Sequence, residues 1–293
     1  MPHTISSSQL EVSIKETGME LCSIKSKSTG KELMWQGDPA FWANHAPVLF
    51  PIIGALKDGL TTIDGKEYAI PKHGLLRYSE KPTLKEKGDD FITFQLHWDD
   101  ETLALYPYKF VFEVTFSVDG NKLTISHKVI NEDEKELLYN LGGHPAFNCP
   151  AVEHEVYEDY YLEFEKSETL NTWLLDSSGL VTDTEKPVIE HSKILPLTDT
   201  LFDNDALIFR NLTSRKVTLK SRKSGGILSV QFDSFPYLGI WAKPGAPFVC
   251  IEPWHGLTDH ANTDGEFTSK EILRNLAAGE SEEMNYTVEV LLN

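Results

Sequence analysis

The stretch Phe110-Val111-Phe112-Glu113-Val114-Thr115-Phe116-Ser117-Val118-Asp119-Gly120-Asn121-Lys122 decides the fold. Large apolar side chains occupy every second position from Phe110 to Val118, with smaller or polar residues between most of them. Because successive side chains of a strand point to opposite faces, this period of two predicts a strand. Asp119-Gly120 is a turn signal, and the alternation resumes at Leu123, so we expect a β-hairpin.

The same alternation recurs along the chain and predicts further strands at 10–14, 92–96, 227–232 and 286–290, and a second hairpin at 62–68. Helical signals are confined to 99–105 and to 269–276, where Ser269 is a suitable N-terminal cap. Nothing alternates strand with helix. The pattern therefore predicts an all-β fold, a large antiparallel β-sandwich or barrel with a few short helices.

Composition limits the classes of function. The chain has 293 residues, of which 40% are hydrophobic, and a formal net charge of −18. Such an acidic surface repels nucleic acid and anionic lipid, so we expect neither as a partner. No secretory signal or membrane-spanning segment is evident, which favours the cytoplasm. We expect one domain over residues 1–293, a monomer or homodimer, with the polar, acidic segment 151–200 as a surface excursion.

Three segments place an ionisable side chain among Gly, Pro and apolar residues. Glu252 ends the apolar run 247–251 and precedes Pro253 and Trp254, His144 lies between two glycines and a proline, and His73 lies in Lys72-His73-Gly74-Leu75-Leu76-Arg77. A rigid, partly dry setting shifts pKa values and suits proton transfer. A solvated glutamate, a structural histidine and a surface ion pair of Arg77 are the alternatives. Trp241 and Trp254 flank Glu252 closely enough to line a shared cleft.

Other chemistries lack their signatures. The spacing of His255, Asp259 and His260 matches no strong metal motif, and glycine-rich phosphate loops are absent. No GxSxG motif indicates a serine hydrolase. The three cysteines, an odd and sparse set, indicate reduced core thiols rather than disulfides. We therefore expect no metal and no cofactor.

At these residues the chain resembles the aldose 1-epimerase (galactose mutarotase) superfamily, and most of all its LacX-like branch. The resemblance extends over nearly the whole chain, and the order and spacing of its segments make it specific. The segments are 49–54, 73–74, 143–148, 202–209, 239–241 and 250–254.

The resemblance implies a large antiparallel β-sandwich with a sugar cleft on one face. It implies that His144 is the general acid that protonates the ring oxygen and that Glu252 is the general base that takes the anomeric hydroxyl proton. His73 and Asp205 would match hydroxyl-binding positions, although Asp203 would share a strand face with Asp205. We expect His144 and Glu252 to face one cavity, about a pyranose ring apart, and to produce a bell-shaped pH dependence.

The favoured function is thus a mutarotase that acts on a free aldohexose, with a small-molecule sugar as substrate. Alternatives are a hexose-6-phosphate mutarotase, a non-catalytic carbohydrate-binding or sensing protein, and a glycoside hydrolase or lyase. Hydrolases generally use two carboxylates, and no second one has a setting like that of Glu252. Better-studied mutarotases carry arginine near the segments 43–48 and 54–57, where this chain has none. Arg77 is the remaining candidate clamp, and Trp241 a stacking surface.

Overall fold

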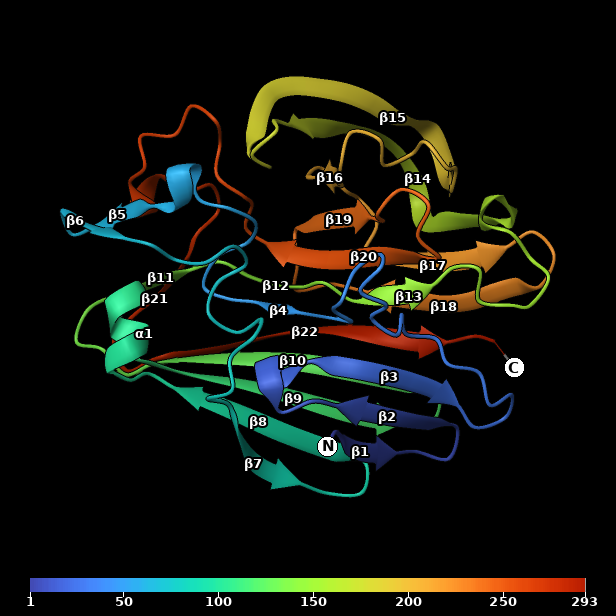
Figure 1. The fold of residues 1–293 in the computed structure, drawn as a ribbon, viewed down its shortest axis with the longest axis horizontal. Helices are drawn as coiled ribbons and strands as arrows, with labels where there is room; N and C mark the ends of the chain where they lie inside the picture. Colours follow the sequence, from blue (N-terminus) through green and yellow to red (C-terminus); the bar gives the residue numbers. More distant parts are fainter. Residues whose placement is uncertain (293) are drawn as a thin grey trace.

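The computed structural model describes residues 1–292 and confirms the all-β class (Figure 1). Within that range the larger sheet has nine antiparallel strands. In spatial order they are β15 (Val181–Pro196), β14 (Tyr160–Leu175), β17 (Lys216–Ser221), β18 (Gly225–Gln231), β22 (Ser281–Val290), β10 (Lys122–Asn131), β9 (Phe110–Asp119), β8 (Phe91–His97) and β7 (Thr83–Lys87). The predicted hairpin is β9–β10, in which Val118 faces Leu123 and Phe116 faces Ile125.

A second sheet carries the candidate site and, in the view of Figure 1, lies above the strands β22 to β7 of the first sheet and below its strand β15. Its strands, in order, are β16 (Leu207–Phe209), β19 (Tyr237–Trp241), β20 (Phe248–His255), β12 (Leu141–Gly143) and β4 (Val48–Leu49), and β13 (Ala146–Asn148) pairs with the start of β20. Phe50, just after β4, stacks on Phe112 of β9 with ring centroids 4.5 Å apart. The two sheets therefore share one apolar layer, as in a β-sandwich.

Smaller sheets flank this sandwich within residues 1–292. They are β1 (His3–Ser6) with β2 (Leu10–Ile14) and β3 (Leu21–Ser26), β5 (Thr61–Ile63) with β6 (Lys66–Tyr68), and β11 (Leu137–Tyr139) with β21 (Arg274–Leu276). The main hydrophobic cluster takes side chains from Ile5 to Leu292. That continuity supports a single domain over 1–293, which stays a prediction.

One predicted helix is present and the other is wrong. The helix α1 (Asp100–Leu105) begins at a capping box, in which Asp99 and Thr102 each accept a hydrogen bond from the other's backbone N–H. Residues 269–276 instead form the end of a 3₁₀ turn (Phe267–Ser269) and strand β21. Leu276 pairs with Leu137, and Ile272 has φ of +47°, so strand pairing overrides the weak helical spacing. No helix among residues 1–292 has the length and apolarity needed to cross a bilayer.

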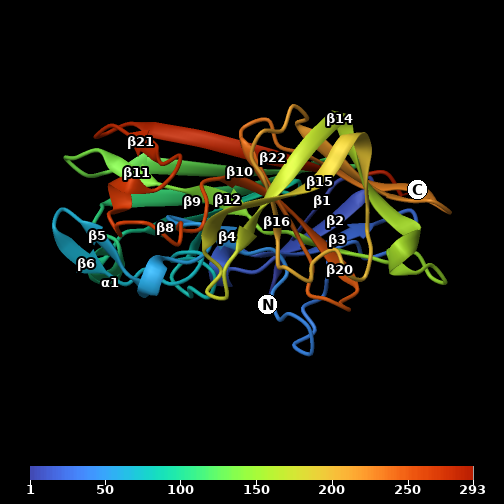
Figure 2. The same ribbon diagram turned by 90° about the horizontal axis from the view of Figure 1, so that it is seen from above.

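The expected surface excursion at 151–200 is mostly a long hairpin of β14 and β15. The first part of β14 pairs with β17, and its remainder pairs only with β15. The hairpin arches over β16 and β19 in Figure 1, and Figure 2 shows it crossing that sheet from above. The sequence of the hairpin is polar because its outer face meets solvent. Trp173 and Leu175 point the other way and pack against a hydrophobic cluster that includes Ile208 and Trp254. The hairpin thus forms a roof over the smaller sheet.

Gly74 is a point where only glycine fits. It has φ of +87°, and a Cβ there would lie 1.9 Å from the carbonyl oxygen of Phe50. That oxygen accepts the backbone N–H of Leu75 at 2.8 Å, which joins the His73 loop to the strand layer.

We expect Gly74→Ala to lower the free energy of unfolding by about 2 kcal/mol more than Gly59→Ala does. Gly59 is the matched control, since it has φ of +73° but no atom within 4 Å of a Cβ, so its variant reports backbone strain alone. Urea unfolding of both variants measures the difference. Equal losses would show that the close approach at Gly74 is unimportant.

Candidate active site

A cavity of about 540 Å³ lies between the smaller sheet and the hairpin roof. Its wall combines aromatic rings with ionisable side chains from distant parts of the sequence. All six predicted site residues line it: His73, Arg77, His144, Asp205, Trp241 and Glu252. A cavity of this size with a few convergent polar groups suits a small polar ligand.

His144 follows the two glycines that end β12, and its position depends on them. A Cβ at Gly143 would lie 2.8 Å from the hydroxyl oxygen of Tyr286 in β22, and one at Gly142 would lie 2.8 Å from the Trp254 ring. Glycine therefore lets this segment approach both sheets. The imidazole is nine-tenths buried and stacks on Trp42 with ring centroids 4.8 Å apart.

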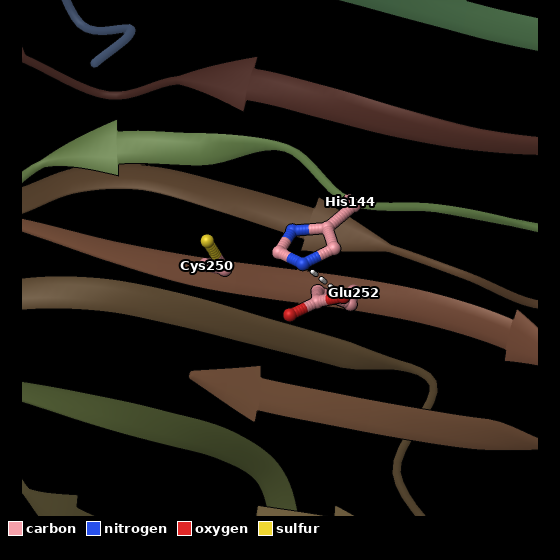
Figure 3. Close-up of side chains that lie close together, drawn as sticks. All are labelled: His144, Cys250 and Glu252. Carbon is pink, nitrogen blue, oxygen red and sulfur yellow. Dashed lines mark ion pairs between the residues drawn. The ribbon is translucent and has the colours of Figure 1, made fainter. Parts of the chain in front are cut away.

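Glu252 lies in the middle of β20, opposite Gly239 of β19, and is 1% exposed. Its Oε2 is 3.3 Å from Nε2 of His144, the contact drawn as a dashed line in Figure 3. The two groups therefore face one cavity, as expected. The expected separation of about a pyranose ring is wrong, because Gly142 pairs with Trp254 of β20 and brings His144 directly onto Glu252.

Burial dominates the titration of both groups. Desolvation lowers the pKa of His144 to about 3. Desolvation raises the pKa of Glu252 well above its usual 4.5, and the negative charge of Asp205 adds to that rise. Both shifts favour the uncharged forms, so the resting pair is a neutral imidazole beside a carboxylic acid. Nδ1 of His144 and Oε2 of Glu252 have no aligned hydrogen-bond partner among the described residues, which leaves bonding capacity for a ligand.

His73 is fixed in one orientation by Gly54. The Nδ1 atom of its ring accepts the backbone N–H of Gly54 at 3.2 Å, and the backbone N–H of His73 donates to the carbonyl oxygen of Gly54 at 2.8 Å. Burial is the main cause that holds the pKa of His73 well below 6.5, and the charge of His144 when it is protonated and the charges of Lys72 and Arg77 act in the same direction. The ring is therefore neutral, and because Nδ1 accepts, the proton is on Nε2. His73 can donate one hydrogen bond to a ligand hydroxyl.

The mouth of the cavity is charged. Asp203 and Asp205 both line it, and they lie in turns before β16 rather than on a shared strand face as expected. Asp205 has φ of +72° and accepts the N–H of Ala206. Arg77 donates weakly to Asn44 at 3.4 Å and covers the ring of Tyr78.

His255, Asp259 and His260, whose spacing matches no metal motif, each contact a different partner. Asp259 forms a buried ion pair with Lys270, and His260 pairs with Asp183 at 3.2 Å. His255 lies beside Arg274 instead. Among residues 1–292, a grouping with metal-ligand spacing does occur at His144, Cys250 and Glu252.

The chain is similar to known proteins over most of its length. The family model of aldose 1-epimerase matches residues 2–274. The chain is 37% identical to the plasmid-encoded protein LacX of Lactococcus lactis subsp. lactis, over 96% of this chain and 97% of that protein.

The chain belongs to the aldose 1-epimerase family.

Two solved structures are similar to this chain over nearly its whole length. The galactose mutarotase related enzyme of Lactobacillus acidophilus has a TM-score of 0.93 and 33% identity, covering 99% of this chain and 97% of that one. A galactose mutarotase-like protein of Lactobacillus casei ATCC 334 has a TM-score of 0.92 and 31% identity, covering 99% and 100%. The galactose mutarotase-like sandwich that the sequence predicted is thereby confirmed.

Sequence reasoning missed several parts of this aldose 1-epimerase cavity. One of them is Trp42, whose ring contacts His144. The adjacent aromatic residues Phe41 and Trp42, just after the turn at Asp38, could have indicated a ligand-binding surface. Leu175 and Gly179 come from the hairpin roof, where the polar sequence concealed them. Trp254, expected near Glu252, does line the cavity, and its indole N–H has no partner among the described residues.

Glu20, a buried carboxylate outside the cavity, holds the segment 45–47, which pairs with the backbone of His144. Oε1 of Glu20 accepts the backbone N–H groups of His45 and Ala46 at 2.7 and 3.1 Å, and Oε2 accepts from Lys15. The next residue, Pro47, accepts the backbone N–H of His144. Burial alone would raise the pKa of Glu20, but the hydrogen bonds from His45 and the charge of Lys15 outweigh it and lower the pKa to about 2.

Glu20 should therefore stabilise the fold in a pH-dependent way. Its folded pKa is below the usual 4.5, so its contribution is complete above pH 4.5 and is lost as the pH falls toward 2. The shift corresponds to about 3 kcal/mol at neutral pH. We expect the difference in unfolding free energy between the native protein and Glu20→Gln to shrink over that window. Glu11→Gln, an exposed change on β2, is the control, and a difference independent of pH would contradict the assignment.

Proposed function

We propose that the protein is a mutarotase that interconverts the α and β anomers of a free aldohexose by acid–base ring opening. The observation that carries the proposal is the buried contact between His144 and Glu252 at the wall of the cavity. A protein that only binds sugar has no need of two desolvated ionisable groups in contact. Family membership supports the same chemistry.

Ring opening moves one proton off the anomeric hydroxyl O1 and one onto the ring oxygen O5. The carboxylate of Glu252 takes the first proton as the C1–O1 bond becomes a carbonyl. The imidazolium of His144 gives the second as the C1–O5 bond breaks. Rotation about C1–C2 exposes the other face of the aldehyde, and the reverse transfers close the ring. The reaction is a net isomerisation, so it requires no redox cofactor.

Burial of the pair favours these transfers. The reactive form is the ion pair, which the dry site disfavours, and the sugar stabilises it because O1–H donates to the carboxylate and O5 accepts from the imidazolium. Both groups become neutral as the ring opens, in the direction that desolvation favours. Each positioned proton transfer contributes roughly 10²- to 10⁴-fold to the rate.

The remaining wall supplies orientation. The Nε2–H group of His73 can donate to a sugar hydroxyl, and the carboxylate of Asp205 can accept from one. Trp241 and Trp42 offer ring faces against the C–H groups of a pyranose, the usual role of aromatic side chains in sugar sites. Arg77 lines the same cavity and would contact a distal substituent of a larger or phosphorylated sugar.

We expect Glu252→Gln and His144→Ala each to lower kcat by about 10²-fold or more, since neither replacement can transfer the required proton. Polarimetry on freshly dissolved galactose and glucose, corrected for the spontaneous reaction, measures the rate. Glu67→Gln, an exposed change on β6, is the control for charge. Near-native rates in well-folded Glu252 and His144 variants would reject the mechanism, and a native rate no faster than the spontaneous one would favour a binding protein.

The pH profile should reflect the shifted pKa values. The pair is active with one proton, a state that exists between the pKa of His144, about 3, and the raised pKa of Glu252. We expect kcat/KM to fall on the acid side near pH 3 and on the alkaline side above the usual range of a glutamate. Circular dichroism at each pH checks the fold. An acid limb near pH 6.5, where a solvated histidine titrates, would contradict the desolvated pair.

A hexose 6-phosphate is the second candidate, because Lys72 and Arg77 line the cavity and neither forms an ion pair within residues 1–292. Against it, Asp203 and Asp205 line the same mouth, and the net charge of −18 repels a dianion. A single arginine also offers few of the charge-assisted hydrogen bonds that hold a phosphate.

We therefore expect kcat/KM to be higher for galactose or glucose than for their 6-phosphates. Each rate must be corrected for its own spontaneous reaction. A preference of about tenfold or more for the phosphates, about 1.4 kcal/mol of transition-state binding, would reverse this assignment. In that event Arg77→Met should remove the preference while it leaves the rate on the free sugar.

A further inference from the structure

Three different ligand atoms converge where the proposed acid–base pair lies. His144, Cys250 and Glu252 each offer one, and these atoms all lie within 4.8 Å of one another (Figure 3). Cys250 and Glu252 are two residues apart on β20, so their side chains leave the same face of the sheet. Pairing of Gly142 with Trp254 and of Ala146 with Cys250 brings the segment of His144 alongside β20.

We propose that these three side chains bind a thiophilic divalent cation such as Zn²⁺. The imidazole nitrogen, the thiolate and the carboxylate are its protein ligands, and a water or a sugar hydroxyl from the cavity is the fourth. The consequence for activity, that the cation inhibits mutarotation, rests on the proposed function; the binding itself does not.

The geometry suits a small tetrahedral ion. Zinc bonds to nitrogen, oxygen and sulfur are roughly 2.0–2.3 Å long, which puts any two ligand atoms roughly 3–4 Å apart. Nε2 of His144 and Oε2 of Glu252 already satisfy this at 3.3 Å. The sulfur of Cys250 lies within 4.8 Å of both atoms, so a shift of roughly 1 Å would complete the spacing.

Charge balance favours a cation in this dry position. A carboxylate and a thiolate together neutralise two positive charges, so the occupied site is neutral overall. Coordination displaces one proton from the Cys250 thiol and one from the Glu252 acid, and both go to solvent. It also satisfies Oε2 of Glu252, which is otherwise buried without an aligned hydrogen bond. Mg²⁺ and Ca²⁺ prefer six or more oxygen ligands, so the single carboxylate selects against them.

The cavity supplies the entry path. His144 and Glu252 line it, and Cys250 lies fully buried behind them. An ion that enters from the cavity meets the nitrogen and oxygen first and the sulfur last. Once bound, it occupies the lone pairs that proton transfer requires, so catalysis stops.

Cobalt tests the binding without reference to sugar. The untagged protein is titrated with Co²⁺, whose bond to a thiolate gives a charge-transfer absorption in the near ultraviolet, and Zn²⁺ is then added as a competitor. We expect one Co²⁺ per chain with that band, displaced by Zn²⁺. Cys22→Ser and Cys149→Ser, which change the other two thiols, should keep the band, and Cys250→Ser should lose it and bind the ion about tenfold or more weakly.

Two results would overturn the proposal: a native protein that gives no thiolate band with Co²⁺, or a band that persists in Cys250→Ser. The native-protein spectrum decides the matter even if the Cys250 variant does not fold, and Cys250→Ala provides a second variant. Polarimetry then tests the consequence, as a ratio of rates with and without Zn²⁺ that a chelator restores. If the protein shows no mutarotation, the spectra still decide whether the cation binds.

Discussion

The fold of this protein serves to hold a histidine and a glutamate in contact away from water. Burial of either group in its charged form would cost several kcal/mol of folding free energy. The pair avoids this cost because the glutamate holds the proton and the imidazole stays neutral. That state is stable only while the surroundings stay dry and closely packed. The apolar layer between the two sheets and the rings of Trp42 and Trp241 provide the packing. In the proposed mechanism, the same dryness that destabilises the ion pair would make it reactive toward a sugar.

Close backbone approach is what brings the pair together. Gly142 and Gly143 let the His144 segment lie between β20 and Tyr286 of β22, and Gly239 leaves room for the ring of Trp254 at 2.6 Å from a notional Cβ. A side chain at any of these positions would separate the strands. Because a shift of about 1 Å is enough to misalign a proton transfer, these glycines bear on catalysis as well as on packing.

The sequence predicted the sheets better than it predicted the site. The alternation at 110–129 and the turn at Asp119-Gly120 are local, so the β9–β10 hairpin and the fold class followed from them. The site residues were identifiable because Glu252 and His144 lie in rigid, apolar settings, and resemblance supplied their roles. Their separation was not predictable, since it depends on the pairing of β12 with β20. The roof was missed for a related reason: β14 and β15 carry many polar residues on their outer side, and their inner side is marked by a few apolar side chains, among them Leu170, Trp173 and Val181.

The roof and the floor of the cavity are joined at Thr258. Its Oγ1 accepts the N–H of Ala55 at 3.0 Å, and its single O–H lies within reach of the carbonyl oxygens of Gly179 at 2.9 Å and Ala55 at 3.1 Å and donates to one of them at a time. Its Cβ fills the space that a side chain at Gly54 would need, and Gly54 in turn fixes the tautomer of His73. One hydroxyl thus links the hairpin tip to His73. If this link loosened, water would enter beneath the roof, and the pKa values of His144 and Glu252 would return toward those of solvated groups. In the proposed mechanism the roof would therefore act on catalysis through the dielectric of the cavity, without touching the reacting atoms.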